Sequence, residues 1–329
     1  MSEQTQQFRQ PPVTVKDDGA PRRVGFELEF SGISLDQAAD ILQRQLGGEF
    51  GAATAAQKIL QVDGLGEFSI ELDWDYLQRT AAERAEQQED GRWVELLSKT
   101  AAFLVPLEVV CPPIPLDKLE LLQPLVAALR KAGASGTEES AVAAYGVHIN
   151  TELPRQNADT LFSYLRAFSL LQWWLQDVHE VNNARRISPY IDLYPDAYVR
   201  QLLARKEPTM DDLFRDYLQH NATRNRALDL LPILADIDPA RVQRAVDDPK
   251  IKPRPAFHYR LPNCQIEKPD WSLADPWRIW CVVEELASRP SDLEELSRLF
   301  QQADHNLLGI NHDKWLETVK QWLSDRELA

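Results

Sequence analysis

The segment Val24–Phe30, with the sequence VGFELEF, alternates apolar and acidic residues after its glycine. Side chains of a β-strand point to its two sides in turn, so Phe26 and Leu28 can face a core while Glu27 and Glu29 face the other way. The Cα atoms of two such glutamates lie roughly 6 to 7 Å apart, which lets their carboxylates hold neighbouring hard cations. The segment therefore predicts a strand that carries a pair of ligands for Mg²⁺ or Mn²⁺.

Four further short segments combine an apolar face with a charged or metal-binding face. They are Ser69–Asp73, Leu107–Val109, Gly146–Asn150 and Phe257–Arg260, and their second faces carry Asp73, Glu108, His148, Asn150, His258 and Arg260. Taken singly, a carboxylate or a histidine on a strand is more often part of a solvated or hydrogen-bonded surface. Clustered acids, however, repel one another unless cations hold them. The five segments together predict one sheet with a divalent-metal site, to which His148 and His258 add nitrogen ligands that shift the preference toward Mn²⁺.

Composition and charge narrow the class of protein. The chain has 329 residues, a formal net charge of −15 and 44% hydrophobic residues, as expected for a folded protein with a sizeable core. The negative charge argues against nucleic acid as a partner. The three cysteines, Cys111, Cys264 and Cys281, lack metal-type spacing and fit reduced thiols in a cytoplasmic protein. No apolar run approaches the length of a membrane span, so we expect no membrane partner.

The order of the patterns predicts an α+β fold with helices packed on one face of the sheet. Ser34 and Gln37 form a capping-box pattern that begins a helix, and a longer helix is predicted over 159–181. We expect residues 1–21 to be a disordered lead-in, residues 22–270 to form one catalytic domain, and residues 271–329 to be a helical C-terminal extension packed on it.

Other common chemistries lack their motifs. The glycines of segments 47–51 and 64–66 are followed by no phosphate-binding lysine, so turns explain them better. No serine or cysteine lies in a nucleophile elbow, and Cys111 precedes two prolines without a visible base. We therefore do not expect a covalent acyl-enzyme.

Four motifs, in their order along the chain, resemble those of the amidoligase family. They are Arg23–Phe30, Ile70–Asp73, Leu107–Pro113 and Tyr145–Asn150, and the resemblance covers roughly residues 22–262. That family belongs to the carboxylate–amine ligase superfamily of glutamine synthetase and glutamate–cysteine ligase. The resemblance implies a curved antiparallel β-sheet like the glutamine synthetase catalytic domain, with helices on its convex side and ATP and metals on its concave face.

The resemblance also implies roles for individual residues. Glu27 and Glu29 match the metal-binding pair of the first strand, and His148 matches a histidine close to the metal. Asn150 stands where relatives place a residue that contacts the nucleotide. Asp73 and Glu108 match acidic positions of the family motifs, as candidates to attract an ammonium group and accept its proton.

The late segment Phe257–Arg260 resembles a Glu-Phe-Arg strand of glutamine synthetase, in which the glutamate binds metal and the arginine contacts phosphate. Here His258 replaces the glutamate, so one metal site is retained with nitrogen, weakened or lost. Arg260 matches the arginine that contacts phosphate in that strand. Arg185 or Arg186 is the candidate for a phosphate-facing arginine of the preceding loop.

The implied reaction is an ATP- and Mg²⁺-dependent ligation of a carboxylate to an amine through an acyl phosphate, with small molecules or peptides as substrates. Two other functions stay open on the residues alone. A phosphotransferase of the guanidino-kinase type would use the same sheet and nucleotide but form no amide. A binding or scaffold protein would carry a decayed site, which the intact Glu27 and Glu29 pair and Arg260 argue against.

Overall fold

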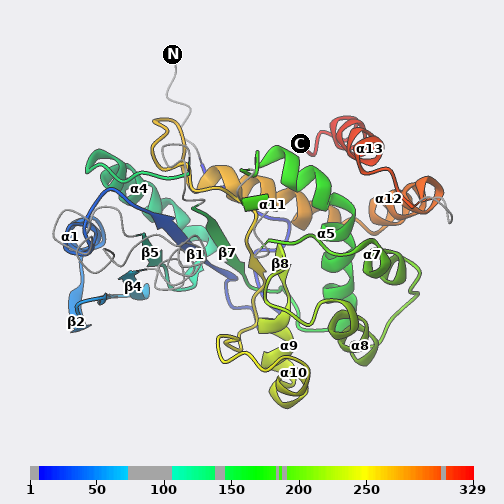
Figure 1. Cartoon of the computed structure of the whole chain (residues 1–329), viewed down its shortest axis with the longest axis horizontal. Helices are drawn as coiled ribbons and strands as arrows, with labels where there is room; N and C mark the ends of the chain where they lie inside the picture. The colour runs from blue at the N-terminus through cyan, green and yellow to red at the C-terminus, as the bar shows by residue number, and fades with distance from the viewer. Residues whose placement is uncertain (1–6, 73–105, 138–144, 183–184, 187–190, 305–308) are drawn as a thin grey trace, which may run out of the picture. The chain divides into compact units, whose positions relative to one another are not determined.

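The computed structural model describes residues 7–72, 106–137, 145–182, 185–186, 191–304 and 309–329 (Figure 1). The chain divides into two units built from non-contiguous segments. The sheet unit comprises Gly25–His148 and Pro262–Leu273. The helical unit comprises Met1–Val24, Ile149–Leu261 and Ala274–Ala329. Each unit therefore combines strands and helices from separate parts of the sequence.

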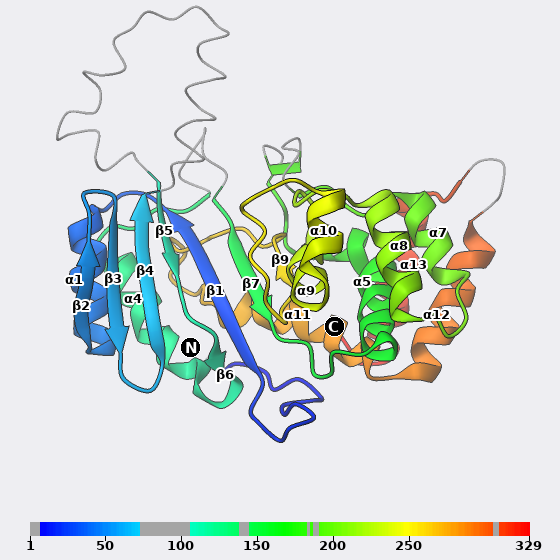
Figure 2. The same cartoon turned by 90° about the horizontal axis from the view of Figure 1, so that it is seen from below.

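The sheet unit is built on antiparallel strands. Their order is β2 (Glu49–Ala53), β3 (Gln57–Val62), β4 (Gly66–Leu72), β5 (Leu107–Val110) and β1 (Arg23–Phe30), with the short β6 (Ile114–Pro115) also beside β1. Figure 2 shows β2 to β5 and β1 side by side in this order. The register sets Glu29 opposite Glu108 and Glu71 opposite Glu108. Three adjacent strands thus carry a glutamate at the same level.

One face of these strands is closed by two helices. Helix α1 (Leu35–Leu46) begins with the predicted capping box, in which Ser34 Oγ accepts from the backbone N–H of Gln37. Helix α4 (Leu122–Lys131) follows the 3₁₀ helix η2 (Leu116–Leu121). Helix α1 packs on β3, β4 and α4. The side chains of Phe26 and Leu28 are fully buried, which leaves the glutamates of β1 on the other face.

The helical unit contains three short strands and most of the helices. Strand β7 (Val147–Thr151), whose last three residues belong to this unit, pairs with β9 (His258–Tyr259), which pairs with β8 (Leu228–Asp229). The long helix α5 (Ala158–Val178) packs on α7 (Asp196–Leu203), α8 (Met210–His220), α11 (Ala274–Ala287), α12 (Pro290–Ala303) and α13 (His312–Ser324). The short helices α9 (Leu231–Ile237) and α10 (Pro239–Ala245) pack on each other.

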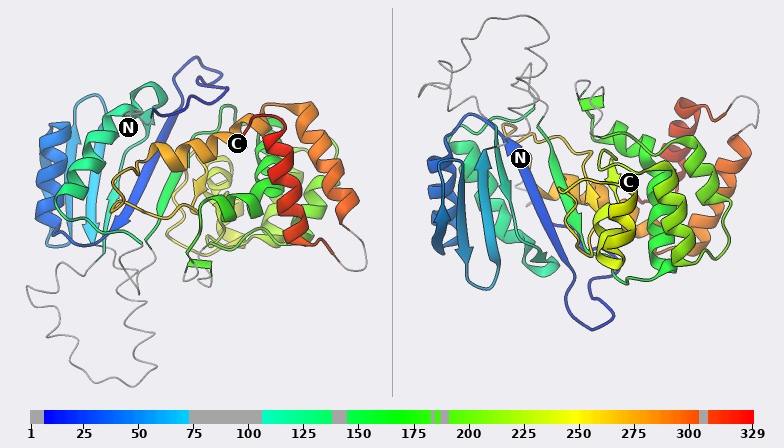
Figure 3. Two further views of the ribbon diagram at one scale, coloured as in Figure 1. Left: turned by 90° about the horizontal axis from the view of Figure 1, so that it is seen from above. Right: turned by 60° about the horizontal axis from the view of Figure 1, so that its bottom comes forward.

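Helices α11 to α13 belong to the same unit as α5, and Figure 3 shows the last two in orange and red. The predicted C-terminal extension is thus grouped with part of the predicted catalytic domain.

The N-terminal segment, which was expected to be a disordered lead-in, also belongs to this unit. There Phe8 is buried and Trp277 Nε1 donates to the carbonyl of Arg9 at 2.7 Å.

The prediction of antiparallel strands combined with helices is confirmed. Each of the five predicted strand segments contains a strand, and the described part of the C-terminal segment is helical as expected, with α11, α12 and α13. Within the described part of the chain, no helix is both long and apolar enough to cross a membrane.

Candidate metal and active site

The polar face of the sheet unit carries a row of three glutamates. Glu71 on β4, Glu108 on β5 and Glu29 on β1 stand opposite one another in register, and all three are half-buried. Cross-strand neighbours have Cβ atoms about 4.5 to 5.5 Å apart, close enough for carboxylates to interact. Like charges at this spacing repel, so the row favours a bound cation.

His148 lies beside this row and contacts both glutamates of β1. Its Nδ1 lies 2.8 Å from Glu27 Oε2, and its Nε2 lies 3.8 Å from Glu29 Oε1. An ionised carboxylate can only accept hydrogen bonds, so the contact with Glu27 requires a proton on Nδ1. In the neutral ring the lone pair then lies on Nε2, on the side of Glu29. Glu27 therefore fixes the tautomer and the orientation of the imidazole.

Glu29, Glu108 and His148 together could hold a metal ion. One ligand atom from each of the three lies within 4.8 Å of the others. Two atoms that bind one cation at about 2.1 Å each lie about 3 to 4 Å apart, which fits the separation of Nε2 and Glu29 Oε1. Two carboxylates with one imidazole suit Mg²⁺ or Mn²⁺. The residues that the structure gathers here thus fit the predicted ion.

Glu71 extends this site beyond what the sequence reasoning identified. Gln57 Nε2 donates to Glu71 Oε2 at 2.8 Å and to Ser69 Oγ at 3.0 Å, and Ser69 Oγ donates to the same carboxylate. These donors hold the Glu71 carboxylate in one orientation beside Glu108. The signal in the sequence was its position two residues before Asp73, which places both acids on one strand face. Asp73 itself lies outside the described residues.

Cys111, which follows β5, is not an available nucleophile. The side chain is buried, and its backbone N–H donates to the carbonyl of Phe26 at 2.8 Å. Burial, with a smaller contribution from the negative charge of Glu27, raises the pKa of the thiol to about 12. The thiolate needed for acyl-enzyme chemistry is therefore suppressed at neutral pH.

In the helical unit, His258 and Arg260 lie together on and next to β9. Arg260 Nη2 donates to His258 Nδ1 at 3.2 Å and lies 3.8 Å from Asp229 Oδ2. Asp229 is buried and accepts from the backbone N–H of Leu231 at 2.9 Å. Burial raises the pKa of Asp229 to about 6, although the nearby guanidinium of Arg260 opposes the shift. His258 and Asp229 thus fix the guanidinium of Arg260.

The two loop arginines predicted to face a phosphate bind backbone carbonyls instead. Arg185 is buried and donates to the carbonyls of Leu261, at 2.7 Å, and Arg260, at 2.6 Å. Arg186 donates to the carbonyls of Val181, at 2.9 Å, and Gln176. Arg185 therefore supports the chain that carries Arg260.

Asn150 has a partner that the sequence did not reveal. Its Oδ1 accepts from Arg254 Nη2 at 2.7 Å. Arg254 lies in a proline-containing segment without a periodic pattern, so no local feature of the sequence predicted this contact.

The predicted site residues are divided between the two units. The sheet unit contains Glu27, Glu29, Glu108 and His148, and the helical unit contains Asn150, Arg185, Arg186, His258 and Arg260.

Comparison with known proteins agrees with the sequence motifs. Residues 20–282 match the family model described as "Putative amidoligase enzyme", a stretch that includes every described strand. No curated protein and no solved structure matches the chain. The match covers well over half of the chain. The protein therefore belongs to the amidoligase family.

Proposed function

We propose that the protein is an ATP- and Mg²⁺-dependent ligase that joins a carboxylate to an amine through an acyl phosphate. Membership of the amidoligase family supports amide-bond formation. The single structural observation that carries the proposal is the group of Glu29, Glu108 and His148, whose ligand atoms lie within 4.8 Å of one another. This donor set suits the metal that accompanies ATP in phosphoryl transfer.

Within this proposal the glutamates of β1 have different roles. Glu29, Glu108 and His148 would hold the ion, and Glu27 would orient His148 through the contact of 2.8 Å with Nδ1. When bound, the ion would neutralise negative charge on the phosphates of ATP. Glu71, held by Gln57 and Ser69, is a carboxylate that can attract an ammonium group and accept a proton from it.

In the helical unit we assign the phosphate contact to Arg260. Its contacts with His258 and Asp229 hold the guanidinium before any ligand arrives, so less side-chain freedom is lost on binding. A guanidinium stabilises the charge of a transferring phosphoryl group. Arg185 would contribute indirectly, because it binds the carbonyl of Arg260.

The proposal is tested with hydroxylamine as the amine. Purified protein is incubated with ATP, Mg²⁺ and pooled amino acids and short peptides, and the expected products are ADP and a hydroxamate. Glu29→Gln should lower the rate at least about 100-fold, because a lost metal ligand removes several kcal/mol of transition-state stabilisation. Glu49→Gln, on the exposed strand β2, serves as the matched control and should keep full activity.

Two outcomes would contradict the proposal. ATP-dependent phosphorylation of a guanidino compound without any hydroxamate would indicate a phosphotransferase. No turnover with any acid, together with no stabilisation of the protein by Mg-ATP, would indicate a non-catalytic binding protein.

A further inference from the structure

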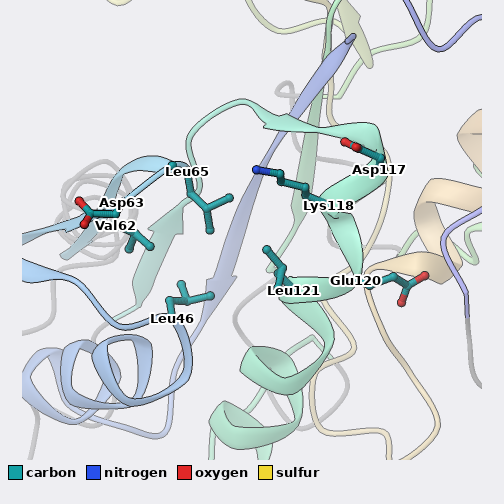
Figure 4. A pocket seen from close by; sticks show the side chains of 9 residues that line it. Leu46, Val62, Asp63, Leu65, Asp117, Lys118, Glu120 and Leu121 are labelled. Carbon is teal, nitrogen blue, oxygen red and sulfur yellow. The ribbon is translucent and has the colours of Figure 1, made fainter.

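A cavity lies in the sheet unit, and its lining contains none of the glutamates of the row. It has a volume of about 450 Å³ and is formed by the C-terminal end of α1, the turn between β3 and β4, and helix η2. Figure 4 shows its lining side chains. A volume of this size is typical of sites for small molecules.

The apolar part of the lining comes from three separate elements. Leu46 ends α1, Val62 and Leu65 flank the β3–β4 turn, and Leu121 ends η2. Leu121 is 47% exposed, so much of its side chain is in contact with water. Covering this surface with an apolar group would be favourable.

Lys118 brings a positive charge to this apolar surface. Figure 4 shows its side chain extending from η2 toward Leu65, with Leu121 beside it. Among the residues that the structure describes, no ion pair joins Lys118 to a carboxylate, although three acidic residues line the same cavity. The ammonium group is therefore available to a carboxylate brought by a ligand.

The acidic residues supply the opposite charge at the rim. Asp63 and Glu120 lie on opposite sides of the cavity in Figure 4, and Asp117 precedes Lys118 on η2. Within the described ranges Asp63 and Asp117 form no ion pair either. A ligand that carries one negative and one positive charge beside an apolar body would match all three parts of the lining.

We propose that this cavity binds a free α-amino acid with an apolar side chain, of the size of leucine. Lys118 binds its carboxylate, the acidic rim attracts its ammonium group, and the side chain contacts Leu46, Leu65 and Leu121. The lining of this cavity contains none of Glu29, Glu108 and His148, so binding there does not depend on the proposed ligase reaction.

The test measures binding, by calorimetric titration of the full chain with L-leucine. We expect saturable binding of one leucine per chain. Lys118→Met should weaken the affinity at least about tenfold, because a charge-assisted hydrogen bond is lost while the apolar stem is kept. Lys131→Met, an exposed change in the last turn of α4, is the matched control and should bind as the wild type does.

A ligand series tests each part of the assignment. Both 4-methylpentanoate, which lacks the ammonium group, and isoamylamine, which lacks the carboxylate, should bind more weakly than leucine, and glycine should not bind. Leu121→Ser should also weaken binding of leucine, and since the residue is exposed, the fold should persist. The proposal is overturned if leucine shows no saturation at about 10 mM, if Lys118→Met binds as the wild type does, or if either analogue binds as well as leucine.

Discussion

Glu27 and Glu29 are separated by one residue on β1, but their contacts differ. Glu27 lies 2.8 Å from His148 Nδ1, a hydrogen-bond distance, whereas Glu29 lies 3.8 Å from Nε2, a distance that leaves room for an ion. The alternation of the strand placed both on one face, as predicted. The difference between their contacts depends on where His148 of β7 lies, and the sequence of β1 carries no information about that position.

This difference gives the first prediction. Glu29→Gln should abolish detectable Mn²⁺ binding, whereas Glu27→Gln should weaken it about 10- to 100-fold, as is usual for partners that orient a ligand. Calorimetric titration with Mn²⁺ measures both, with Glu49→Gln as the control. Neither variant should be less stable without metal, because each removes one charge from a repelling cluster. Wild-type affinity in both variants would exclude this metal site.

His258 stands where the resemblance to a glutamine synthetase strand implied a glutamate. Arginine has no acceptor atom, so in the contact of 3.2 Å His258 Nδ1 accepts from Arg260. We predict that His258→Ala raises the KM for ATP about fivefold, the effect of one lost hydrogen bond, and leaves Mn²⁺ binding unchanged. Steady-state kinetics and metal titration separate the two roles. Loss of a metal ion in His258→Ala would instead make His258 a ligand.

Asp229 predicts a pH dependence of stability. Its pKa is about 6 in the folded protein, above the usual 3.8, so between these values the folded state holds a proton that the unfolded chain has released. The free energy of unfolding should therefore fall as pH rises through this window. Relative to Asp229→Asn, the wild type should lose about 2 kcal/mol between about pH 4 and pH 7. Urea denaturation of both proteins across this range measures the effect. If the free energy of unfolding of the wild type relative to Asp229→Asn stays constant or increases with pH, the prediction is wrong.

At the scale of elements, the N-terminal segment is joined to α11 by a buried ion pair. Arg22 Nη1 and Nη2 each donate to Glu284 at 2.9 Å, and both side chains are almost fully buried. Tyr164 and Trp280 donate to the same carboxylate. Arg22 also donates to the carbonyls of Val13 and Glu152. One guanidinium thus connects the N-terminal segment, the chain after β7 and helix α11.

Removal of Arg22 should be costly because Glu284 would remain buried without its counter-ion. We predict that Arg22→Met lowers the free energy of unfolding by about 3 to 5 kcal/mol, and that adding Glu284→Gln recovers part of the loss. Lys16→Met is the control, because the ion pair of Lys16 with Glu152 is partly exposed and should contribute less than about 1 kcal/mol. Denaturant unfolding of the three variants measures the effects, and equal losses in Arg22→Met and Lys16→Met would contradict the account.

The five strand segments could be predicted from the sequence because each alternates apolar with polar residues, whereas β2, β6 and β8 were not predicted, and 47–51, expected to be a turn, contains the start of β2. Helix α1 could also be predicted, because the capping box of Ser34 and Gln37 lies within one short stretch of sequence. The pairing of strands was not visible, because register depends on contacts between distant segments. The spacing of Glu71 from Asp73 put both acids on one strand face, but its place in the row follows only from its alignment with Glu108. The contact of Arg254 with Asn150 joins residues 104 positions apart and has no local signal.

At the scale of the whole molecule, the division into two units was not predicted. We expected one domain over 22–270 with an extension, whereas each unit is assembled from separate segments of the chain. Composition does not change where the chain passes from one unit to the other, within β7 and near residues 24, 261 and 273. Domain boundaries are recognisable in sequence when a linker marks them, and here the boundary at β7 lies inside a strand.

The central claim is that this chain activates a carboxylate with ATP before an amine attacks it. The most direct measurement uses an acid identified by hydroxamate formation, labelled with ¹⁸O in its carboxyl group, and follows the label by mass spectrometry. In the acyl-phosphate route a carboxylate oxygen attacks the γ-phosphate and leaves with it when the amine displaces phosphate. We expect ADP and one ¹⁸O in the released inorganic phosphate for each amide formed. Label in AMP, or phosphate without label, would contradict it.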